Sequence, residues 1–220
     1  MDYKALWRYK VMATRPAWSV IDEAIICQKY EFSWNSGFSI AQKQKNIKAL
    51  HQAIQESSNE TALEVSSKGC DPVGKNIGAF SLKSNGIYLE NIFQASKKYE
   101  LGGPFLDLLD VTPKEAKQDE RHHISGNLIS FVKDGLEWSL EPKTAFYDYI
   151  YVNALVDNFG QILDLSVYNW FTDIEFNQKK SINCQARSVA IYKLLQKKSL
   201  FNVIKDRNEW LKFHIEYVRG

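Results

Sequence analysis

The sequence predicts a single α+β domain, mainly helical with a small sheet and hairpins, and three observations support this prediction. The chain has 220 residues, 45% apolar and 25% charged, which suits one sizeable globular domain. Apolar residues recur at helical spacing in several segments, whereas other segments mix β-branched and aromatic residues. Turn signals separate these segments, and no repeat or low-complexity linker interrupts them.

The first third of the chain predicts strands followed by one long helix. Residues 3–35 mix aromatic and β-branched residues and end at the turn signal Asn35-Ser36-Gly37, which favours short strands and loops. Ser39 can cap a helix that runs to about Glu56. Its apolar positions fall at helical spacing: Ile40, Ile47, Leu50 and Ile54. Two candidate strands follow, at 63–65 and 79–82.

The rest of the chain is predicted to be mostly helical. A helix is expected from Leu89 to about Glu100, where Gly102-Gly103-Pro104 stops it. Thr112-Pro113 opens a further helical stretch, because proline suits the first helical position after a cap. Asp134-Gly135 predicts the turn of a hairpin at 129–140. Three more helices are expected, at 142–155, 183–198 and 205–213.

Composition and charge exclude several classes of protein. The net charge of +2 does not by itself indicate a nucleic-acid-binding protein. No apolar run approaches the roughly 20 residues that span a bilayer, so we expect a cytoplasmic protein with no membrane partner. The three cysteines are widely separated and odd in number, which fits a reducing cytosol. Because the chain has no glycine-rich phosphate loop, nucleophile elbow or zinc signature, no metal and no cofactor are expected.

The stretch 90–97 carries the most informative chemistry. On a helix, Glu90 and Lys97 lie about 20° from one line, with Gln94 between them. A carboxylate, an amide and an amine then share one stripe. A solvated polar face has the same spacing, but this helix is short and follows a turn that would aim its first residue at a cleft.

Two other stretches also hold candidate site residues. Asp173 and Glu175 precede a polar loop that leads into a helix start, where Asn183 is a fair cap. Backbone N–H groups at such a start can hold a phosphate or a sugar hydroxyl, although a loop without a ligand fits equally well. Trp138 either stacks on a ligand ring or seals a core, and packing is the more ordinary use. His122-His123 are expected to be surface residues, because adjacent side chains diverge.

An ordered set of motifs runs through about 15–200. Its members are 32–34 with 37–39 and 42–45, then 63–68, 77–80, 90–97, 102–104, 138–148 and 171–187. In number and order these motifs resemble the NADAR (YbiA-like) superfamily, specifically its subgroup of antitoxins associated with DarT-type DNA ADP-ribosyltransferase toxins. The resemblance implies a single NADAR-type domain over 1–220, with 1–60 as an N-terminal extension packed on a catalytic core at 61–200.

The resemblance also implies roles for particular residues. It assigns catalytic roles to Glu90, Lys97 and Asp173. The residues expected to bind substrate are Lys68, Phe80, Phe93, Gln94, Trp138, Tyr147, Glu175, Asn177 and Asn183. One departure matters, because residues 177–181 replace the glycine-rich loop of the wider family. Glu175 is therefore a rival to Asp173 as the second acid.

The activity implied by the resemblance is an ADP-ribosyl glycohydrolase that removes ADP-ribose from guanine bases of DNA. The expected partners are ADP-ribosylated DNA, ADP-ribose and a cognate DarT-type toxin. Two alternatives stay open. One is an N-glycosidase acting on a small-molecule N-glycoside, such as a riboflavin-pathway intermediate. The other is a non-enzymatic module that binds ADP-ribose or masks the toxin.

Overall fold

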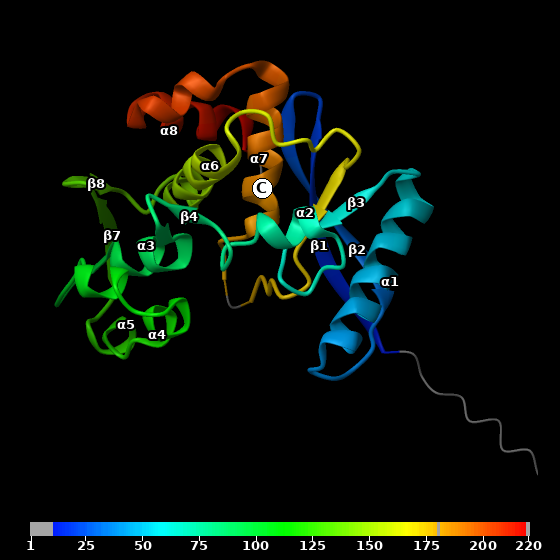
Figure 1. Ribbon diagram of the computed structural model, residues 1–220, viewed down its shortest axis with the longest axis horizontal. Helices are drawn as coiled ribbons and strands as arrows, with labels where there is room; N and C mark the ends of the chain where they lie inside the picture. Colours follow the sequence, from blue (N-terminus) through cyan, green and yellow to red (C-terminus); the bar gives the residue numbers. More distant parts are fainter. Residues whose placement is uncertain (1–10, 180, 219–220) are drawn as a thin grey trace, which may run out of the picture.

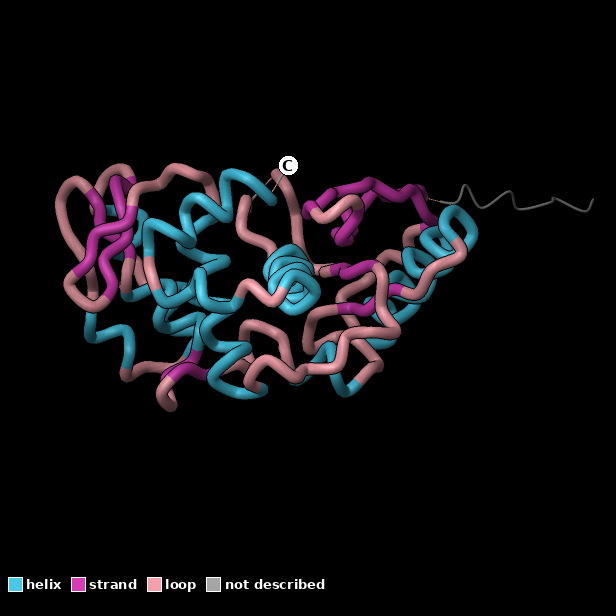
Figure 2. Tube along the Cα trace, turned by 90° about the horizontal axis from the view of Figure 1, so that it is seen from above, coloured by secondary structure: helices cyan, strands magenta, loops and turns pink. Residues whose placement is uncertain are grey.

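The structure is a computed structural model that describes residues 11–179 and 181–218. Strands gather at two ends of the molecule with helices between them, as Figures 1 and 2 show. This arrangement confirms the predicted α+β class. Residues 3–10 of the predicted strand region lie outside the described residues. The division into 1–60 and 61–200 stays a prediction.

The larger sheet has the strand order β2-β1-β9-β3. Its strands are β1 (Met12–Ile21), β2 (Ala24–Ser33), β3 (Ala62–Glu64) and β9 (Trp170–Thr172). The hairpin of β1 and β2 is longer than the short strands that the sequence predicted. β9 pairs antiparallel with β1 and parallel with β3, which sets Glu64 opposite Thr172. The residues that follow β9 therefore start beside the end of β3.

Helix α1 (Ile40–Ser58) covers one face of this sheet and confirms the predicted first helix. The Ser39 hydroxyl accepts a hydrogen bond from the Gln42 N–H at 3.2 Å and so caps the helix. Three residues of the predicted apolar stripe, Ile47, Leu50 and Ile54, are buried in one cluster with Tyr30 and Trp170 of the sheet. The fourth, Ile40, is 57% exposed, because the first turn of the helix extends beyond the sheet-facing cluster.

Helices α6 (Ala145–Phe159) and α7 (Gln185–Lys198) pack together in the middle of the molecule and hold most of the main core. A short 3-10 helix, Phe201–Lys205, and α8 (Arg207–Tyr217) follow α7. These elements confirm the last three predicted helices. The cap position of α7 is Cys184, however, and not Asn183 as predicted. No described helix has the length and apolar character needed to cross a membrane.

The other end of the molecule is built from short elements. They are α3 (Leu89–Ala95), β6 (Lys97–Tyr99), a 3-10 turn at Leu106–Leu109, α4 (Pro113–Gln118), α5 (Arg121–Ile124), β7 (Leu128–Lys133) and β8 (Leu136–Trp138). Asp134 and Gly135 form the predicted hairpin turn with φ of 51° and 74°. Thr112 and Glu115 form a capping box at the start of α4.

The prediction of a strand at 79–82 was wrong. The segment lies between α2 (Pro72–Asn76) and the small hairpin of β4 (Lys83–Ser84) and β5 (Ile87–Tyr88). The N–H groups of Ser81 and Leu82 both donate to the Gly78 carbonyl, at 2.8 and 3.0 Å. The Ala79 N–H donates to the Gln185 side chain at 2.8 Å. Since these N–H groups bond locally or to a side chain, the segment forms a tight turn.

The helix predicted over Leu89 to Glu100 ends at Ala95 instead, and Lys97 begins β6. The Ala95 carbonyl accepts from the Phe105 N–H at 2.9 Å, and the Ser96 carbonyl accepts from the Val132 N–H at 2.7 Å. In a longer helix, these two carbonyl groups would accept hydrogen bonds from N–H groups four residues further along the chain. Because they are bonded to Phe105 and Val132 instead, the helix ends. Gly103 permits the close return of the chain, because a Cβ there would lie 2.3 Å from the Lys97 carbonyl oxygen.

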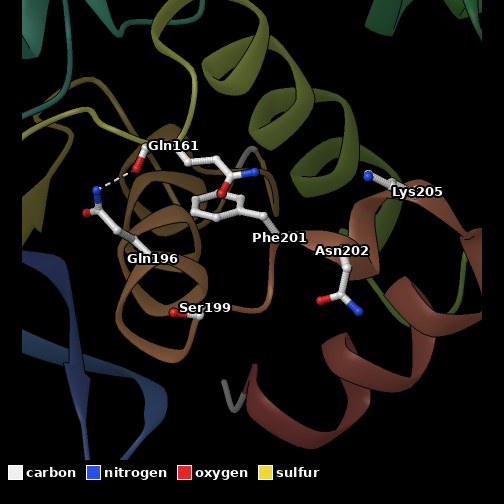
Figure 3. Close-up of a pocket in the computed structure, with 6 residues that line it drawn as sticks. All are labelled: Gln161, Gln196, Ser199, Phe201, Asn202 and Lys205. Carbon is white, nitrogen blue, oxygen red and sulfur yellow. Dashed lines mark hydrogen bonds between the residues drawn. The ribbon is translucent and has the colours of Figure 1, made fainter.

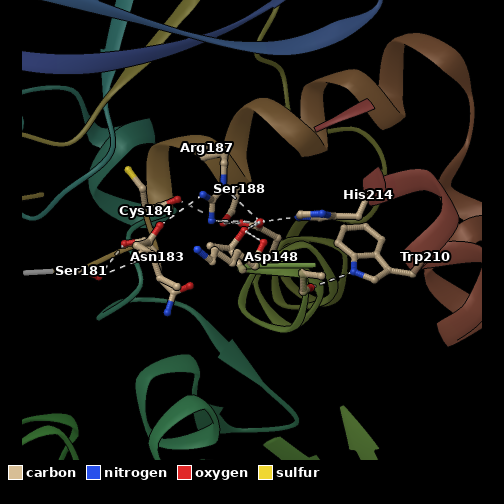
Figure 4. A network of polar contacts seen from close by, with 12 residues as sticks. Asp148, Ser181, Asn183, Cys184, Arg187, Ser188, Trp210 and His214 are labelled. Carbon is tan, nitrogen blue, oxygen red and sulfur yellow. Dashed lines mark hydrogen bonds and ion pairs between the residues drawn. The ribbon is translucent and has the colours of Figure 1, made fainter. Parts of the chain in front are cut away.

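A buried carboxylate joins the three large C-terminal helices (Figure 4). Asp148 of α6 is fully buried and accepts from Arg187 and Ser188 of α7, with the Ser188 hydroxyl at 2.6 Å. His214 of α8 lies 3.0 Å from the same carboxylate. Although burial alone would raise the pKa of Asp148, the Arg187 charge and the bonds from His214 and Ser188 lower it. The carboxylate is therefore held ionised among fixed partners.

Replacing Asp148 with alanine should lower the free energy of unfolding by about 3–5 kcal/mol, because the variant leaves the Arg187 charge buried without its partner. Urea unfolding followed by circular dichroism measures this loss. The matched control is Asp110→Ala, an exposed aspartate, which should stay within about 0.5 kcal/mol of wild type. Equal stabilities for the two variants would contradict the structural role of Asp148.

Candidate functional site

A pocket of about 500 Å³ is formed by the segments that follow β3, α2 and β9, together with α4 and the first residue of α7. It is lined by Ser66, Ser67, Lys68, Gly78, Ala79, Phe80, Ser81, Lys117, Glu175 and Gln185. Three of the predicted substrate-binding residues, Lys68, Phe80 and Glu175, are among them. Phe80 is 49% exposed, which is unusual for so large an apolar side chain. The pocket thus combines an open aromatic surface with cations and hydroxyl groups, a suitable lining for a nucleotide-like ligand.

Glu90, Gln94 and Lys97 do meet, although not on one helix. The Gln94 side chain donates to Glu90 Oε1 at 2.8 Å and accepts from Lys97 Nζ at 2.6 Å. Glu90 and Gln94 are buried on α3, and Lys97 reaches back from β6. The predicted grouping of carboxylate, amide and amine therefore holds, with a different geometry from the predicted stripe.

The environment of Lys97 makes its amine unusually acidic. Burial lowers the pKa of Lys97 to about 8, and the nearby Lys117 charge also lowers it, against the opposing effect of Glu90. Its Nζ lies 5.1 Å from the centre of the Phe93 ring. The amine is still mainly protonated at physiological pH, but its neutral form, which a nucleophilic lysine requires, is far more populated than in an ordinary lysine.

Lys117 links this group to the pocket, and sequence reasoning missed it. Its Nζ lies 3.8 Å from Glu90 Oε1 and 5.3 Å from the centre of the Phe80 ring. The residue stands in the last turn of α4, a segment that the sequence marked only as helical. No local pattern pairs it with Glu90, because the contact depends on how α4 packs on α3.

Asp173 lies behind the pocket wall formed by Gln185 and Glu175. It accepts from the Gln185 side chain at 2.9 Å and from the Glu175 N–H at 3.0 Å. Burial and the nearby negative charge of Glu64 together raise the pKa of Asp173 to about 7, although these two hydrogen bonds oppose the rise. Asp173 is therefore largely protonated below neutral pH.

Glu64 is a second residue that the sequence did not single out. It is buried on β3 and accepts from the Ser66 hydroxyl and from the Ile174 N–H, at 2.7 and 2.9 Å. It also accepts from the Thr172 hydroxyl at 2.7 Å. Since Thr172 and Ile174 flank Asp173, Glu64 fixes the backbone that presents this acid. A glutamate at the end of a short predicted strand gives no such signal.

His51 completes the hydrogen-bonded chain behind Glu64. Its Nε2 lies 2.8 Å from the Thr172 hydroxyl oxygen. Burial lowers the pKa of His51 to about 4, so the ring is neutral at physiological pH.

Three other predicted site residues, Phe93, Tyr147 and Trp138, are buried and do not line the pocket. Phe93 and Tyr147 are buried with ring centres 5.1 Å apart, and the pKa of Tyr147 is raised mainly by burial and also by the charges of Glu90 and Asp173. Tyr147 therefore lies within electrostatic reach of both acids. Trp138 is 3% exposed and packs on Phe146 and Tyr149, outside the pocket lining.

Asn177 and Asn183 belong to the loop before α7 and are not among the residues that line the pocket. The Asn177 side chain accepts from the Lys179 N–H at 2.9 Å, and Asn183 bonds to Ser181 through its backbone. Arg187 also donates to the Ile182 carbonyl at 3.3 Å and so ties this loop to the Asp148 cluster (Figure 4). Lys180 lies outside the described residues.

A second hollow, also of about 500 Å³, opens between the ends of α6 and α7 (Figure 3). It is lined by Gln161, Gln196, Ser199, Phe201, Asn202 and Lys205. Lys205 is its one charged lining residue, and no acid accompanies it. The first pocket is therefore the better candidate for acid–base chemistry.

The chain is thus an α+β domain in which a buried acid–amide–amine chain is linked through Lys117 to a ligand-sized pocket. The family model of the DarT1-associated NADAR antitoxins matches residues 13–219 of this chain. The chain therefore belongs to the DarT1-associated NADAR antitoxin family. Among curated proteins, none matches it.

Replacing Glu64 with glutamine should flatten the dependence of stability on pH between about pH 4 and 7. The native state binds extra protons in this window because the pKa values of Glu64 and Asp173 are raised above their unfolded values, so their contribution to stability falls as the pH rises. The glutamine fits, since its amide can donate to Thr172, whose hydroxyl then donates to neutral His51.

Thermal unfolding of wild type and Glu64→Gln at several pH values measures this effect. Glu56→Gln, the same change on an exposed face of α1, should leave the wild-type profile intact. Parallel profiles for wild type and Glu64→Gln would show that Glu64 neither takes up extra protons on folding nor raises the pKa of Asp173.

Proposed function

We propose that this protein is an ADP-ribosyl glycohydrolase that removes ADP-ribose from guanine bases of DNA and so acts as the antitoxin of a DarT-type toxin. The hydrogen-bonded chain from Glu90 through Gln94 to Lys97, beside a pocket lined by Phe80 and cations, carries this proposal. Membership of an antitoxin family associated with DarT1 supports it, because that toxin class modifies DNA with ADP-ribose.

The proposed reaction breaks the bond between the anomeric carbon of the distal ribose and the exocyclic nitrogen of guanine. Glu90 accepts a proton from a ribose hydroxyl or from water. The electron pair of the broken bond leaves with the guanine nitrogen, which takes up a proton. Water supplies the hydroxyl of the product, so the products are unmodified DNA and ADP-ribose. The positive charge that develops on the ribose favours a nearby carboxylate.

Lys97 offers a covalent route for the same hydrolysis. Its neutral amine attacks the anomeric carbon of the ring-opened sugar and expels the guanine amine, which leaves a Schiff base on Lys97. Water then hydrolyses this intermediate and regenerates the free amine. In the simpler route, Lys97 stays protonated and only stabilises Glu90 or a phosphate. The lowered pKa of Lys97 favours the covalent route.

The remaining polar residues would hold the substrate. Lys68 and Lys117 line the pocket and suit the diphosphate of ADP-ribose, and exposed Phe80 suits stacking on a base. Glu175, which lines the pocket, or its rival Asp173, which is bonded behind it, would orient ribose hydroxyls.

Incubation with a guanine-ADP-ribosylated oligonucleotide tests the proposed activity. Wild type should release ADP-ribose, and Glu90→Gln should reduce turnover at least about 100-fold because it removes the base while keeping the hydrogen bond to Gln94. Glu115→Gln, on exposed α4, is the matched control. If folded wild type releases nothing, the proposal fails and an N-glycosidase of small molecules becomes the better hypothesis.

Lys97→Arg separates the two routes. It keeps the positive charge but removes the nucleophilic amine, so the covalent route predicts a loss of at least about 100-fold in kcat. For wild type, kcat should rise as the pH increases through about 8, where Lys97 loses its proton, and this rise should be absent from the residual activity of the variant. Near-normal turnover by Lys97→Arg would exclude the Schiff base.

A further inference from the structure

The loop between β2 and α1 presents aromatic side chains at the surface. Phe38 is 99% exposed. Trp34, at the start of the loop, is half-buried and lies beneath two cations, with Arg15 5.1 Å and Lys43 5.9 Å from its ring centre. Phe38 is the most exposed large apolar side chain among the described residues, and it follows the cation-flanked Trp34 by four positions in the same loop.

The loop is held in place rather than left loose. Asn46 of α1 is fully buried, and its side chain bonds to both backbone polar groups of Asn35. It accepts from the Asn35 N–H at 2.6 Å and donates to the Asn35 carbonyl at 3.0 Å. Gly37, with φ of 132°, packs against Gln42 so closely that a Cβ would lie 3.0 Å from the Gln42 Cγ. The fold thus fixes where Trp34 and Phe38 are displayed.

This surface is continuous with the candidate site. Lys43 forms an ion pair with Glu175 at 2.9 Å, and Glu175 lines the pocket. A continuous series of side-chain contacts therefore leads from the pocket through Glu175 and Lys43 to Trp34 and then to Arg15. Two enclosed polar atoms at the same place, Arg15 Nε and Gln42 Oε1, have no hydrogen-bond partner among the described residues. Native proteins leave few such groups unpaired.

We propose that Arg15, Trp34, Phe38 and Lys43 form a track for single-stranded DNA that leads to the pocket. This inference rests on the proposed function, since the strand would be the DNA that flanks the modified guanine. Aromatic rings stack on unpaired bases of any sequence, and neighbouring cations attract the phosphates. A double helix keeps its bases paired and offers no free faces to these rings, so the observations favour a single strand.

A lysine on another face of α1 provides a control for the charge of the track. Lys48 is exposed and lies about 140° around the helix from Lys43. It carries the same charge without the aromatic neighbours. The track hypothesis therefore predicts that Arg15 and Phe38 matter for flanking nucleotides, whereas Lys48 does not.

Comparing substrates of two lengths tests the track. One substrate is a single-stranded oligonucleotide of about 12 nucleotides with one ADP-ribosylated guanine, and the other is a trinucleotide with the same modified guanine. The ratio of their kcat/KM values, long to short, measures the contribution of the flanking strand. Phe38→Ala and Arg15→Gln should each lower this ratio about fivefold or more. The matched controls, Ile162→Ala at another exposed apolar position and Lys48→Gln, should leave it within twofold.

Binding of an unmodified strand separates failure of the track from failure of the proposed activity. Fluorescence anisotropy with a labelled single strand of about 12 nucleotides needs no turnover, so it tests the track even if wild type releases no ADP-ribose. Unchanged ratios and unchanged affinities in Phe38→Ala and Arg15→Gln would overturn the track. If the same variants instead lost binding to a purified DarT-type toxin, the surface would be a protein interface, which also overturns it.

Discussion

The charge of Asp148 is the constraint on which much of the molecule depends. A carboxylate can be ionised in a core only if cations and hydrogen-bond donors surround it, and here these donors come from α7 and α8. The cluster therefore fixes how α6, α7 and α8 pack (Figure 4). Through Arg187 it also holds the loop that connects β9 to α7. The pocket wall formed by Gln185 and Glu175, with Asp173 bonded behind it, follows from this packing.

Two groups of titratable side chains contact residues that line the pocket, and their surroundings differ. On one side, burial beside Lys117 makes the Lys97 amine partly neutral, while Glu90 is bonded to Gln94. On the other side, burial beside Glu64 keeps Asp173 largely protonated below neutral pH. Neighbouring groups with pKa values shifted in opposite directions are typical of sites that transfer protons. This contrast is the physical basis for proposing hydrolysis over simple binding.

Much of the fold was predictable because its signals are local. The Ser39 cap, the Asp134-Gly135 turn and the apolar stripe of α1 each depend on residues near in sequence. The early end of α3 was not predictable, since Phe105 and Val132 supply the bonds that stop it. The local pattern singled out Glu90, Lys97 and Asp173 as candidates, but their catalytic roles came from the family resemblance. The sequence did not predict a role for Lys117 or Glu64, because their contacts join elements that are far apart in the chain.

A crystal structure of Glu90→Gln with ADP-ribose tests most directly the claim that this pocket is the active site. We expect the distal ribose to lie beside residue 90 and Lys97, with the diphosphate near Lys68 or Lys117. ADP-ribose bound instead in the hollow between Gln161 and Lys205, or bound nowhere at saturating concentration, would contradict it.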